Sequence, residues 1–347
     1  MRILITAVLL LVLPLLAASL VATQPYDADR VFNQLKLGQL WSEKARFVDD
    51  WYAVEAIDAE TFIIGEPKSS QYNSSYLIVG EQRALLIDAG SGERPDGIRN
   101  MRALAESLTG KPVTLALSHF HFDHMGDLEA FDGAVLTESA ELRKRAGAIG
   151  NVVQAGAHEV LTGERAIRVA EWVASGQSID LGNRRVELRT TPGHAEHSTT
   201  FIDRERRYVF TGDFLYQHLG GLVAFLPGSD VKTYAAEIDR LLASTGDSYR
   251  YFGAHGLQEF GAEWTRKVQQ AMHSLAAGSA KTSLGESYLA PHLPLRMHRD
   301  EQLLVYMPPV VEAKTLYTWS FAASLLAGAV VLSLLMWRAL SYRRARV

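Results

Sequence analysis

The chain has four places where a β-rich run stops at a histidine or an aspartate, and this recurrence constrains its fold more than any other feature. The densest is SHFHFDHMGD, which continues the apolar run at residues 113–118. The other three are PGH at 192–194, TGD at 211–213 and GAH at 253–255. Each contains a glycine, which permits tight turns and close backbone approach. We therefore expect several strands to end around one crowded polar site.

The cluster after the first run holds three histidines and one aspartate within six positions. Borderline metals such as zinc bind imidazole nitrogen and carboxylate oxygen, and a loop at a strand end can turn alternate side chains toward one point. A solvated polar loop is the alternative for any single histidine. With the ends of the other runs, the candidate ligands are His119, His121, Asp123, His124, His194, Asp213 and His255. This is the right inventory for two metal ions that share a bridging carboxylate and a bridging water.

Composition narrows the class of protein. The 347 residues are 48% hydrophobic and 21% charged, which indicates a packed domain and excludes a disordered tail. There is no cysteine, so disulfides and thiolate ligands are excluded and any metal must be held by histidine and carboxylate. Five of the 35 basic residues lie in two ends without acidic residues, which leaves 30 basic against 39 acidic residues, or −9, in the middle. We therefore expect a small-molecule substrate and do not expect nucleic acid as a partner.

The N-terminal end has the layout of an export signal. Residues 3–26 carry no charge and follow a single arginine, as in a secretory signal peptide or an N-terminal anchor. Small residues at 17–19 offer a cleavage site, but an apolar run of this length also spans ~30 Å of hydrocarbon. Residues 1–26 are thus expected to be one or the other, and either would export the chain.

The C-terminal end has the pattern of a transmembrane helix. Residues 316–337 are uncharged, carry aromatic residues at their borders and precede an arginine-rich tail at 338–347. Aromatic borders with a basic flank are typical of a membrane span whose tail is cytoplasmic, with a buried core helix as the alternative. We expect a membrane-anchored protein whose catalytic domain lies on the extracytoplasmic, periplasmic side.

Between the ends we expect one catalytic domain at 27–284 and a proline-containing stalk at 285–315. The domain alternates short β-rich runs with helical patterns, which is an α/β arrangement. Helical spacing is expected near 97–108, at 138–148 and at 158–174. A further helix is expected at 230–244, with Asp230 as its N-cap.

The cluster resembles that of the metallo-β-lactamase-fold hydrolases over roughly residues 50–260. Their His-x-His-x-Asp-His motif is complete here, and His194, Asp213 and His255 follow in the family's order. The resemblance implies an αββα sandwich with metals at one edge of two facing sheets. For a dinuclear member it implies His119, His121 and His194 on one ion, Asp123, His124 and His255 on the other, and Asp213 as the bridge. Asp88 resembles the family's structural aspartate, with a turn-forming residue as the alternative.

Departures and matches indicate the branch. His121 in place of glutamate disfavours the diiron flavoproteins. The missing cysteine and the bridging Asp213 favour a glyoxalase II-like or lactonase-like enzyme over a β-lactamase. Tyr216, three residues after Asp213, matches the position where some lactonases hold the substrate carbonyl, and a packing role is the alternative. His197 and His218 lie near the motifs and could line the pocket, although a satisfied or exposed histidine is the commoner case.

The function expected is metal-dependent hydrolysis of a carbonyl ester, thioester or lactone. Two divalent ions, zinc first and iron or manganese as alternatives, would activate the bridging water. Asp123 and Tyr216 are the expected catalytic residues, for proton transfer and for the developing oxyanion. Phosphodiester or β-lactam hydrolysis, a mononuclear iron sulfur dioxygenase and a non-catalytic metal-binding protein remain alternatives. The oligomeric state is open.

Overall fold

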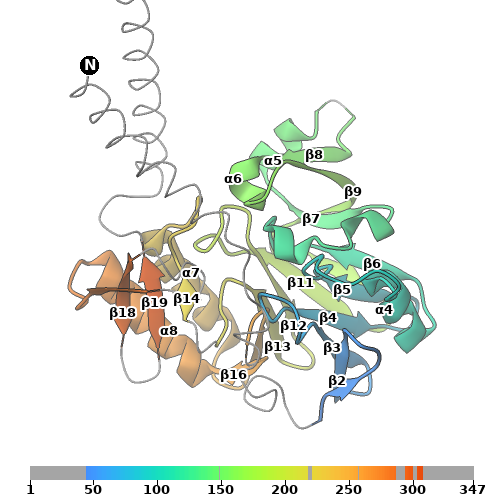
Figure 1. The fold of residues 1–347 in the computed structure, drawn as a ribbon, viewed down its shortest axis with the longest axis horizontal. Coiled ribbons are helices and arrows are strands. Elements are labelled where there is room, and N and C mark those ends of the chain that lie inside the picture. The colour runs from blue at the N-terminus through green and yellow to red at the C-terminus, as the bar shows by residue number, and fades with distance from the viewer. Residues whose placement is uncertain are drawn as a thin grey trace, which may run out of the picture.

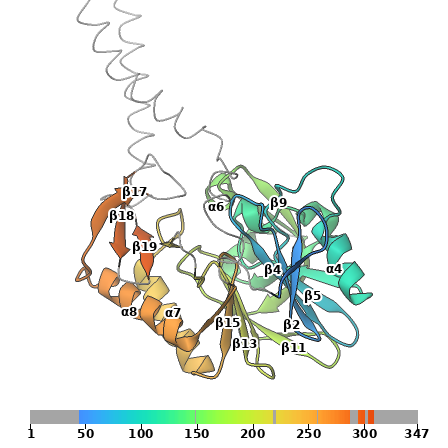
Figure 2. The ribbon, with the colours of Figure 1, turned by 60° about the horizontal axis from the view of Figure 1, so that its bottom comes forward.

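Two large β-sheets face each other in the computed structural model, with helices on both outer faces (Figure 1, Figure 2). The structure describes residues 44–147, 149–217, 221–256, 258–286, 294–299 and 303–307. One core cluster fills the space between the sheets. A second lies between the first sheet and its helices, and a third lies between the second sheet and its helices. The expected αββα layering is therefore present.

The first sheet has the order β1-β2-β3-β4-β5-β6-β7-β9-β8. Its strands are β1 (Arg46–Phe47), β2 (Ala53–Asp58), β3 (Thr61–Gly65), β4 (Ser74–Val79), β5 (Ala84–Ile87), β6 (Val113–Ala116), β7 (Ala134–Glu138), β8 (Val152–Ala155) and β9 (Arg165–Ala174). Every residue of β4 and β5 is buried, as expected for strands covered on both faces. Because β5 and β6 are parallel, the residues that follow them emerge at the same edge.

The second sheet has the order β10-β11-β12-β13-β15-β16. Its strands are β10 (Ser178–Asp180), β11 (Arg185–Thr190), β12 (Thr199–Asp203), β13 (Tyr208–Gly212), β15 (Arg250–Gly253) and β16 (Glu259–Gly261). The parallel pairing of β13 with β15 brings the ends of these two strands to one edge. Two of the four sequence patterns thus meet there.

Helices cover the outer faces. They are α4 (Met101–Thr109), α5 (Ala140–Arg145), α6 (Ala157–Val160), α7 (Val231–Thr245) and α8 (Ala262–Ala276), with 3-10 turns η1 (Phe122–His124) and η2 (Leu128–Ala130). The predicted N-cap of α7 is confirmed, since Asp230 Oδ1 accepts a hydrogen bond of 2.7 Å from the Thr233 N–H. Buried residues of α4 pack on the first sheet, whereas those of α7 and α8 pack on the second.

Arg184 forms a buried ion pair within the second sheet and also contacts the first sheet. Arg184 Nε donates to Asp203 Oδ2 at 2.6 Å, and its Nη2 donates to Thr61 Oγ1 of the first sheet at 2.8 Å. The side chains of Arg184 and Asp203 are 1% and 0% exposed. A charge buried this deeply is tolerated only with a partner and further hydrogen bonds, and here Asp203 of the second sheet and Thr61 of the first sheet supply them.

Two sequence expectations are wrong in the described residues. The helical pattern at 158–174 covers the short helix α6 and then the long strand β9, in which Ile167 and Val169 pack against the core. Alanine, arginine and glutamate favour a helix there locally, but pairing with β7 and β8 overrides that preference.

The expected stalk at 285–315 contributes strands instead. A four-stranded sheet has the order β14-β19-β18-β17, and its strands are β14 (Leu222–Val223), β17 (Ser283–Glu286), β18 (Pro294–Arg299) and β19 (Leu304–Met307). Leu303 and Val305 are buried against the core of α7 and α8. The apolar run before residue 308 forms β19, and Pro294 takes the first position of β18, where a missing N–H is tolerated.

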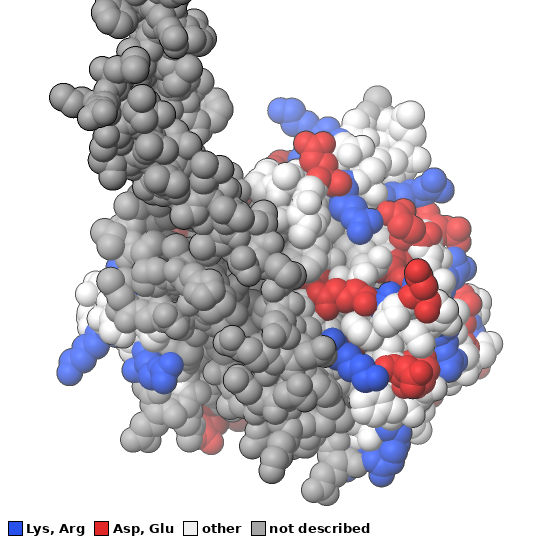
Figure 3. Space-filling view, in the orientation of Figure 1, with Lys and Arg blue, Asp and Glu red and all other residues white. Residues whose placement is uncertain are grey.

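The expected signal or anchor at 1–26, the transmembrane helix at 316–337 and the tail at 338–347 lie outside the described residues. Within the described part, no helix has the length and apolar character needed to cross a membrane. On the face drawn in Figure 3, acidic and basic side chains are interspersed over the described residues. That face does not present there the continuous basic surface that a polyanion requires.

Candidate metal centre

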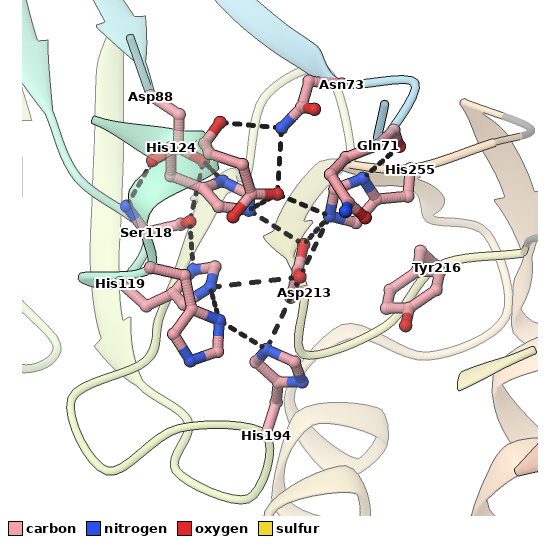
Figure 4. A network of polar contacts seen from close by, with 12 residues as sticks. Gln71, Asn73, Asp88, Ser118, His119, His124, His194, Asp213, Tyr216 and His255 are labelled. Carbon is pink, nitrogen blue, oxygen red and sulfur yellow. Dashed lines mark hydrogen bonds and ion pairs between the residues drawn. The ribbon is translucent and has the colours of Figure 1, made fainter. Parts of the chain in front are cut away.

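The strand ends bring the seven candidate ligands together (Figure 4). Asp88 follows β5, and the 119–124 cluster follows β6 and runs into η1. Asp213 and His255 follow β13 and β15 of the other sheet, and His194 comes from the loop after β11. The site therefore lies at the edge where the two sheets meet, and all seven candidate ligands are buried.

The first group contains three histidines and Asp213. His119 Nε2 lies 2.8 Å from His121 Nδ1, and His194 Nε2 lies 3.2 Å from the same atom. Asp213 Oδ2 lies 3.4 Å from His194 Nε2 and 3.9 Å from His119 Nε2. The four ligand atoms are all within 4.8 Å of one another, so they could hold one ion.

The second group contains Asp123, His124 and His255. Asp123 Oδ2 lies 3.5 Å from the Nε2 atom of each histidine. Asp213 Oδ1 lies 3.3 Å from His124 Nε2 and 2.9 Å from His255 Nε2. Asp213 Oδ2 also lies 3.0 Å from His255 Nε2, so the carboxylate of Asp213 lies between the two groups and contacts both, which is the position of a carboxylate that could bridge two ions.

Four of the histidines are oriented at Nδ1 by an acceptor outside the two groups. The pairs are His119 with Ser118 Oγ (3.0 Å), His124 with Asp88 Oδ2 (2.9 Å), His194 with the Val223 carbonyl oxygen (3.0 Å) and His255 with the Gln71 carbonyl oxygen (2.8 Å). A proton held at Nδ1 leaves the lone pair of Nε2 free for a metal. His121 differs, because it presents Nδ1 to its neighbours.

Buried atoms without hydrogen bonds show that the residues fit a metal. Among the described residues, His124 Nε2 and Asp213 Oδ1 are buried and make no hydrogen bond, although they face each other. Leaving such polar atoms unsatisfied costs about 1–3 kcal/mol each. A divalent cation would satisfy both atoms, and nitrogen with carboxylate oxygen is a donor set that zinc, iron and manganese accept.

A family model described as the metallo-beta-lactamase superfamily matches residues 71–254. The chain belongs to the metallo-β-lactamase superfamily. It is 31% identical over 211 residues to the acyl-coenzyme A thioesterase MBLAC2 of Gallus gallus, a match that covers 56% of this chain and 76% of that one. It is 28% identical over 190 residues to the hydroxyacylglutathione hydrolase GloC of Haemophilus influenzae, covering 54% and 86%.

A solved structure of the metallo-β-lactamase IND-7 matches with a TM-score of 0.50 and 14% identity over 65% of this chain and 100% of that one. At that identity the match shows the shared fold alone. The family match and the two relatives together identify this chain as a metallo-hydrolase of the superfamily.

Electrostatics favour the metal-binding forms of the first group of this metallo-hydrolase. Burial lowers the pKa of His119 and of His121 well below the ordinary value, so both imidazoles are neutral at physiological pH. Burial alone would raise the pKa of Asp213, but His255 and His124 hold it well below its ordinary range. Neutral imidazole and ionised carboxylate are the forms that coordinate a cation.

Asp88 has the structural role expected of the superfamily's aspartate. Its Oδ1 accepts a 2.7 Å hydrogen bond from the Ser118 N–H, and its Oδ2 accepts one of 2.7 Å from Ser118 Oγ as well as the contact with His124. Its backbone has a φ of +66°, a left-handed conformation in which aspartate and asparagine are enriched. Asp88 thus fixes the start of the metal-binding loop.

Tyr216 is buried next to the site. Its ring lies edge-on to His255 at 5.3 Å between centroids, and its hydroxyl accepts a hydrogen bond of 3.0 Å from the Val223 N–H. In Figure 4 the hydroxyl lies at the end of the ring away from His255. This position fits the packing alternative, and donation to a substrate oxyanion stays a prediction.

A cavity beside the first group is lined by His119 and His121 and also by His158, Glu159 and His197. His197 thus lines the pocket, as one reading of the sequence expected, whereas His158 carried no sequence signal. Arg145 donates two hydrogen bonds to Glu159, at 2.9 and 2.7 Å. His218 lies outside the described residues. The sequence also gave no indication that Gln71 and Asn73 contact the site.

Proposed function

We propose that this metallo-hydrolase cleaves a carbonyl ester, thioester or lactone at a two-metal centre, with a thioester as the first candidate. The observation that carries the proposal is the position of Asp213, whose carboxylate lies between two groups of buried candidate ligands and contacts both. The thioester choice is supported by the names of the two relatives, which describe hydrolysis of an acyl group carried by the thiols coenzyme A and glutathione.

Zinc is the proposed metal, with iron or manganese as alternatives. When bound, two divalent ions supply an activated water and polarise the acyl carbonyl. The chain's residues then do the rest. His119, His121 and His194 would hold one ion, and Asp123, His124 and His255 would hold the other, with Asp213 between the two groups. Asp123 is proposed to accept the water proton and to pass it to the leaving thiol or alcohol.

The acyl group of the substrate is proposed to be neutral or weakly charged. The middle of the chain carries −9, and a net charge of that sign disfavours additional negative charge on the acyl group. With the thiol carrier held constant, a neutral acyl group should therefore be cleaved at a higher kcat/KM than a carboxylated one, with the difference shrinking in high salt.

A matched substrate panel tests the reaction. The zinc-loaded protein is assayed against one acyl group presented as a thioester, an oxygen ester and a lactone, and against a phosphodiester and a β-lactam. The thioester should give the highest kcat/KM, and Asp213→Asn should abolish turnover. Preferential cleavage of the phosphodiester or the β-lactam would overturn the acyl assignment. Oxygen consumption with a persulfide by the iron-loaded protein would favour the dioxygenase alternative.

We also propose that the enzyme is membrane-tethered, with residues 27–315 outside the cytoplasm and residues 338–347 inside. The support is the uncharged run at 316–337 and the arginine-rich tail behind it. Because the chain has no cysteine, single cysteines can be placed in the domain and in the tail. An impermeant thiol reagent should label only the domain cysteine in intact cells. Labelling of the tail cysteine alone would show that the topology is the reverse of the one proposed.

A further inference from the structure

The segment just before β4, residues 71–73, contacts two members of the second ligand group, Asp123 and His255. Asn73 is 2% exposed, and its Nδ2 donates to the backbone carbonyl oxygen of Asp123 at 2.7 Å and to Asp123 Oδ2 at 3.2 Å (Figure 4). An amide NH₂ is the only part of this side chain that can face two acceptors, so the orientation of the amide is fixed by its partners. Asn73 therefore holds both the backbone and the carboxylate of Asp123.

The same segment pairs with the strand end that carries His255. Asn73 and His255 form an antiparallel β-bridge, and the Ser74 N–H donates to the Ala254 carbonyl oxygen at 2.8 Å. Two residues before Asn73, the carbonyl oxygen of Gln71 accepts the hydrogen bond from His255 Nδ1. The backbone at 71–74 thus positions His255 while the side chain of Asn73 positions Asp123.

Asn73 is itself held rigidly. Its carbonyl oxygen accepts a 2.9 Å hydrogen bond from the Glu66 N–H, and its own N–H donates to Ser69 Oγ at 3.3 Å. Because the backbone of Asn73 is held by these hydrogen bonds, its side-chain amide stays in one place and restrains the residue to which it donates. Asp123 lies in the loop after β6 of the first sheet, and His255 follows β15 of the second sheet. Asn73 therefore contacts two candidate ligands that are far apart in the sequence.

We propose that Asn73 is a positioning residue that aligns Asp123 with His255 and thereby sets the affinity of the second ion. The inference rests on the two-metal function proposed above. Without the Nδ2 donor, the carboxylate of Asp123 is free to rotate away from His255, while the first group makes no contact with Asn73. Loss of such an outer contact typically weakens metal binding by about 10–100-fold.

The test is titration of the metal-free, full-length protein with Co²⁺, followed by calorimetry and by the visible spectrum of the bound ion. In Asn73→Ala the dissociation constant of the second ion should rise by about 10–100-fold, with that of the first ion unchanged. Asn73→Asp keeps the shape and the contact with Ser69, but places a carboxylate against two acceptors. Asn73→Asp should therefore weaken binding of the second ion further. It also provides a second variant for the test if the alanine variant folds poorly.

Asn100→Ala is the matched control. Asn100 caps α4 by accepting from the Ala103 N–H at 2.8 Å, so its loss lowers stability by about 1 kcal/mol through the helix cap and removes no hydrogen bond to a candidate ligand. Its two Co²⁺ affinities should equal those of the wild type. Equal weakening of both ions by Asn73→Ala, or no weakening of either, would overturn the positioning role while leaving the two-metal function intact. A single Co²⁺ site in the wild type would overturn both.

Discussion

The carboxylate of Asp88 accepts a hydrogen bond from His124, with 2.9 Å between Asp88 Oδ2 and His124 Nδ1. Both side chains are almost completely buried, at 3% and 1% exposed. The contact holds one proton of His124 on Nδ1, so Nε2 is the atom that would bind a metal. Burial alone would lower the pKa of His124, but Asp123, Asp213 and Asp88 hold it well above its ordinary value, so a metal ion would displace the proton on Nε2. A residue outside the ligand set thereby fixes the tautomer of one inside it.

Asp88→Asn tests this relationship without changing side-chain shape. Asparagine tolerates the left-handed backbone at this position, but its amide would donate toward His124 Nδ1 and move the imidazole proton to Nε2. We expect the dissociation constant of the second ion to rise by roughly 10–100-fold, while the melting temperature of the metal-free protein stays unchanged. Nitrogen-15 shifts of His124 report the tautomer directly. An unaltered tautomer with unaltered metal affinity would show that Asp88 serves the turn alone.

The buried pair of Arg184 and Asp203 should dominate the response of stability to single changes. Asp203→Asn leaves the Arg184 guanidinium, 1% exposed, without its counter-ion, and should lower the free energy of unfolding by about 3–5 kcal/mol. The double variant Arg184→Met with Asp203→Leu should lose less, because no charge is left buried. Urea unfolding of both variants decides the point, and equal losses would mean that packing rather than charge controls this position.

Stability should depend on the ionisation of Glu66. This side chain accepts from Trp51 Nε1 and the Ser91 N–H, and burial raises its pKa to about 7. The folded state therefore holds a proton that the unfolded state, with an ordinary carboxyl, has already released. That stabilisation is full below about pH 4.5 and is lost as pH rises through about 7, a total of about 3 kcal/mol.

Comparison with Glu66→Gln isolates this contribution, because glutamine does not titrate and other groups cancel in the difference. The free energy of unfolding of the wild type minus that of the variant should fall between pH 5 and pH 8. Chemical denaturation at intervals across that range measures it. A difference that stays constant with pH would place the titration of Glu66 outside the range.

Tyr216→Phe should separate its two candidate roles. The lactonase-like role predicts intact metal content and a roughly 10–100-fold lower kcat/KM for a lactone or ester, the scale of one lost hydrogen bond at a reacting oxygen. The hydrogen bond with the Val223 N–H predicts a loss of about 1–3 kcal/mol in unfolding free energy, because a buried donor is left unsatisfied. We expect both effects. Lower stability with unchanged kcat/KM would assign Tyr216 to packing.

The sequence predicted that the seven candidate ligands come together because each of them carries a local signal. The four histidine–aspartate patterns lie at strand ends, and parallel pairing of β5 with β6 and of β13 with β15 brings those ends together. The N-cap of α7 was predictable for the same reason, since Asp230 contacts a residue three positions away. Features whose partners are near in sequence, or that follow a strand, can be found without the fold.

Features that depend on distant partners could not be found in this way. Asn73 contacts Asp123 fifty residues away and pairs with His255, and nothing around Asn73 in the sequence indicates either contact. Strand β9 has the composition of a helix, and only its pairing with β7 and β8 makes it a strand. The prolines at 291, 294, 308 and 309 favoured a stalk over the strands β18 and β19, and the burial of Val305 in β19 depends on packing against α7 and α8.

Asp213 is proposed to bridge two divalent ions, and the metal content of the protein tests this most directly. Elemental analysis of the purified wild type should give about two divalent ions per chain, whereas Asp213→Asn should retain the ion of His119, His121 and His194 and lose the other first. A single iron per chain, with a content unchanged by Asp213→Asn, would contradict the two-metal account.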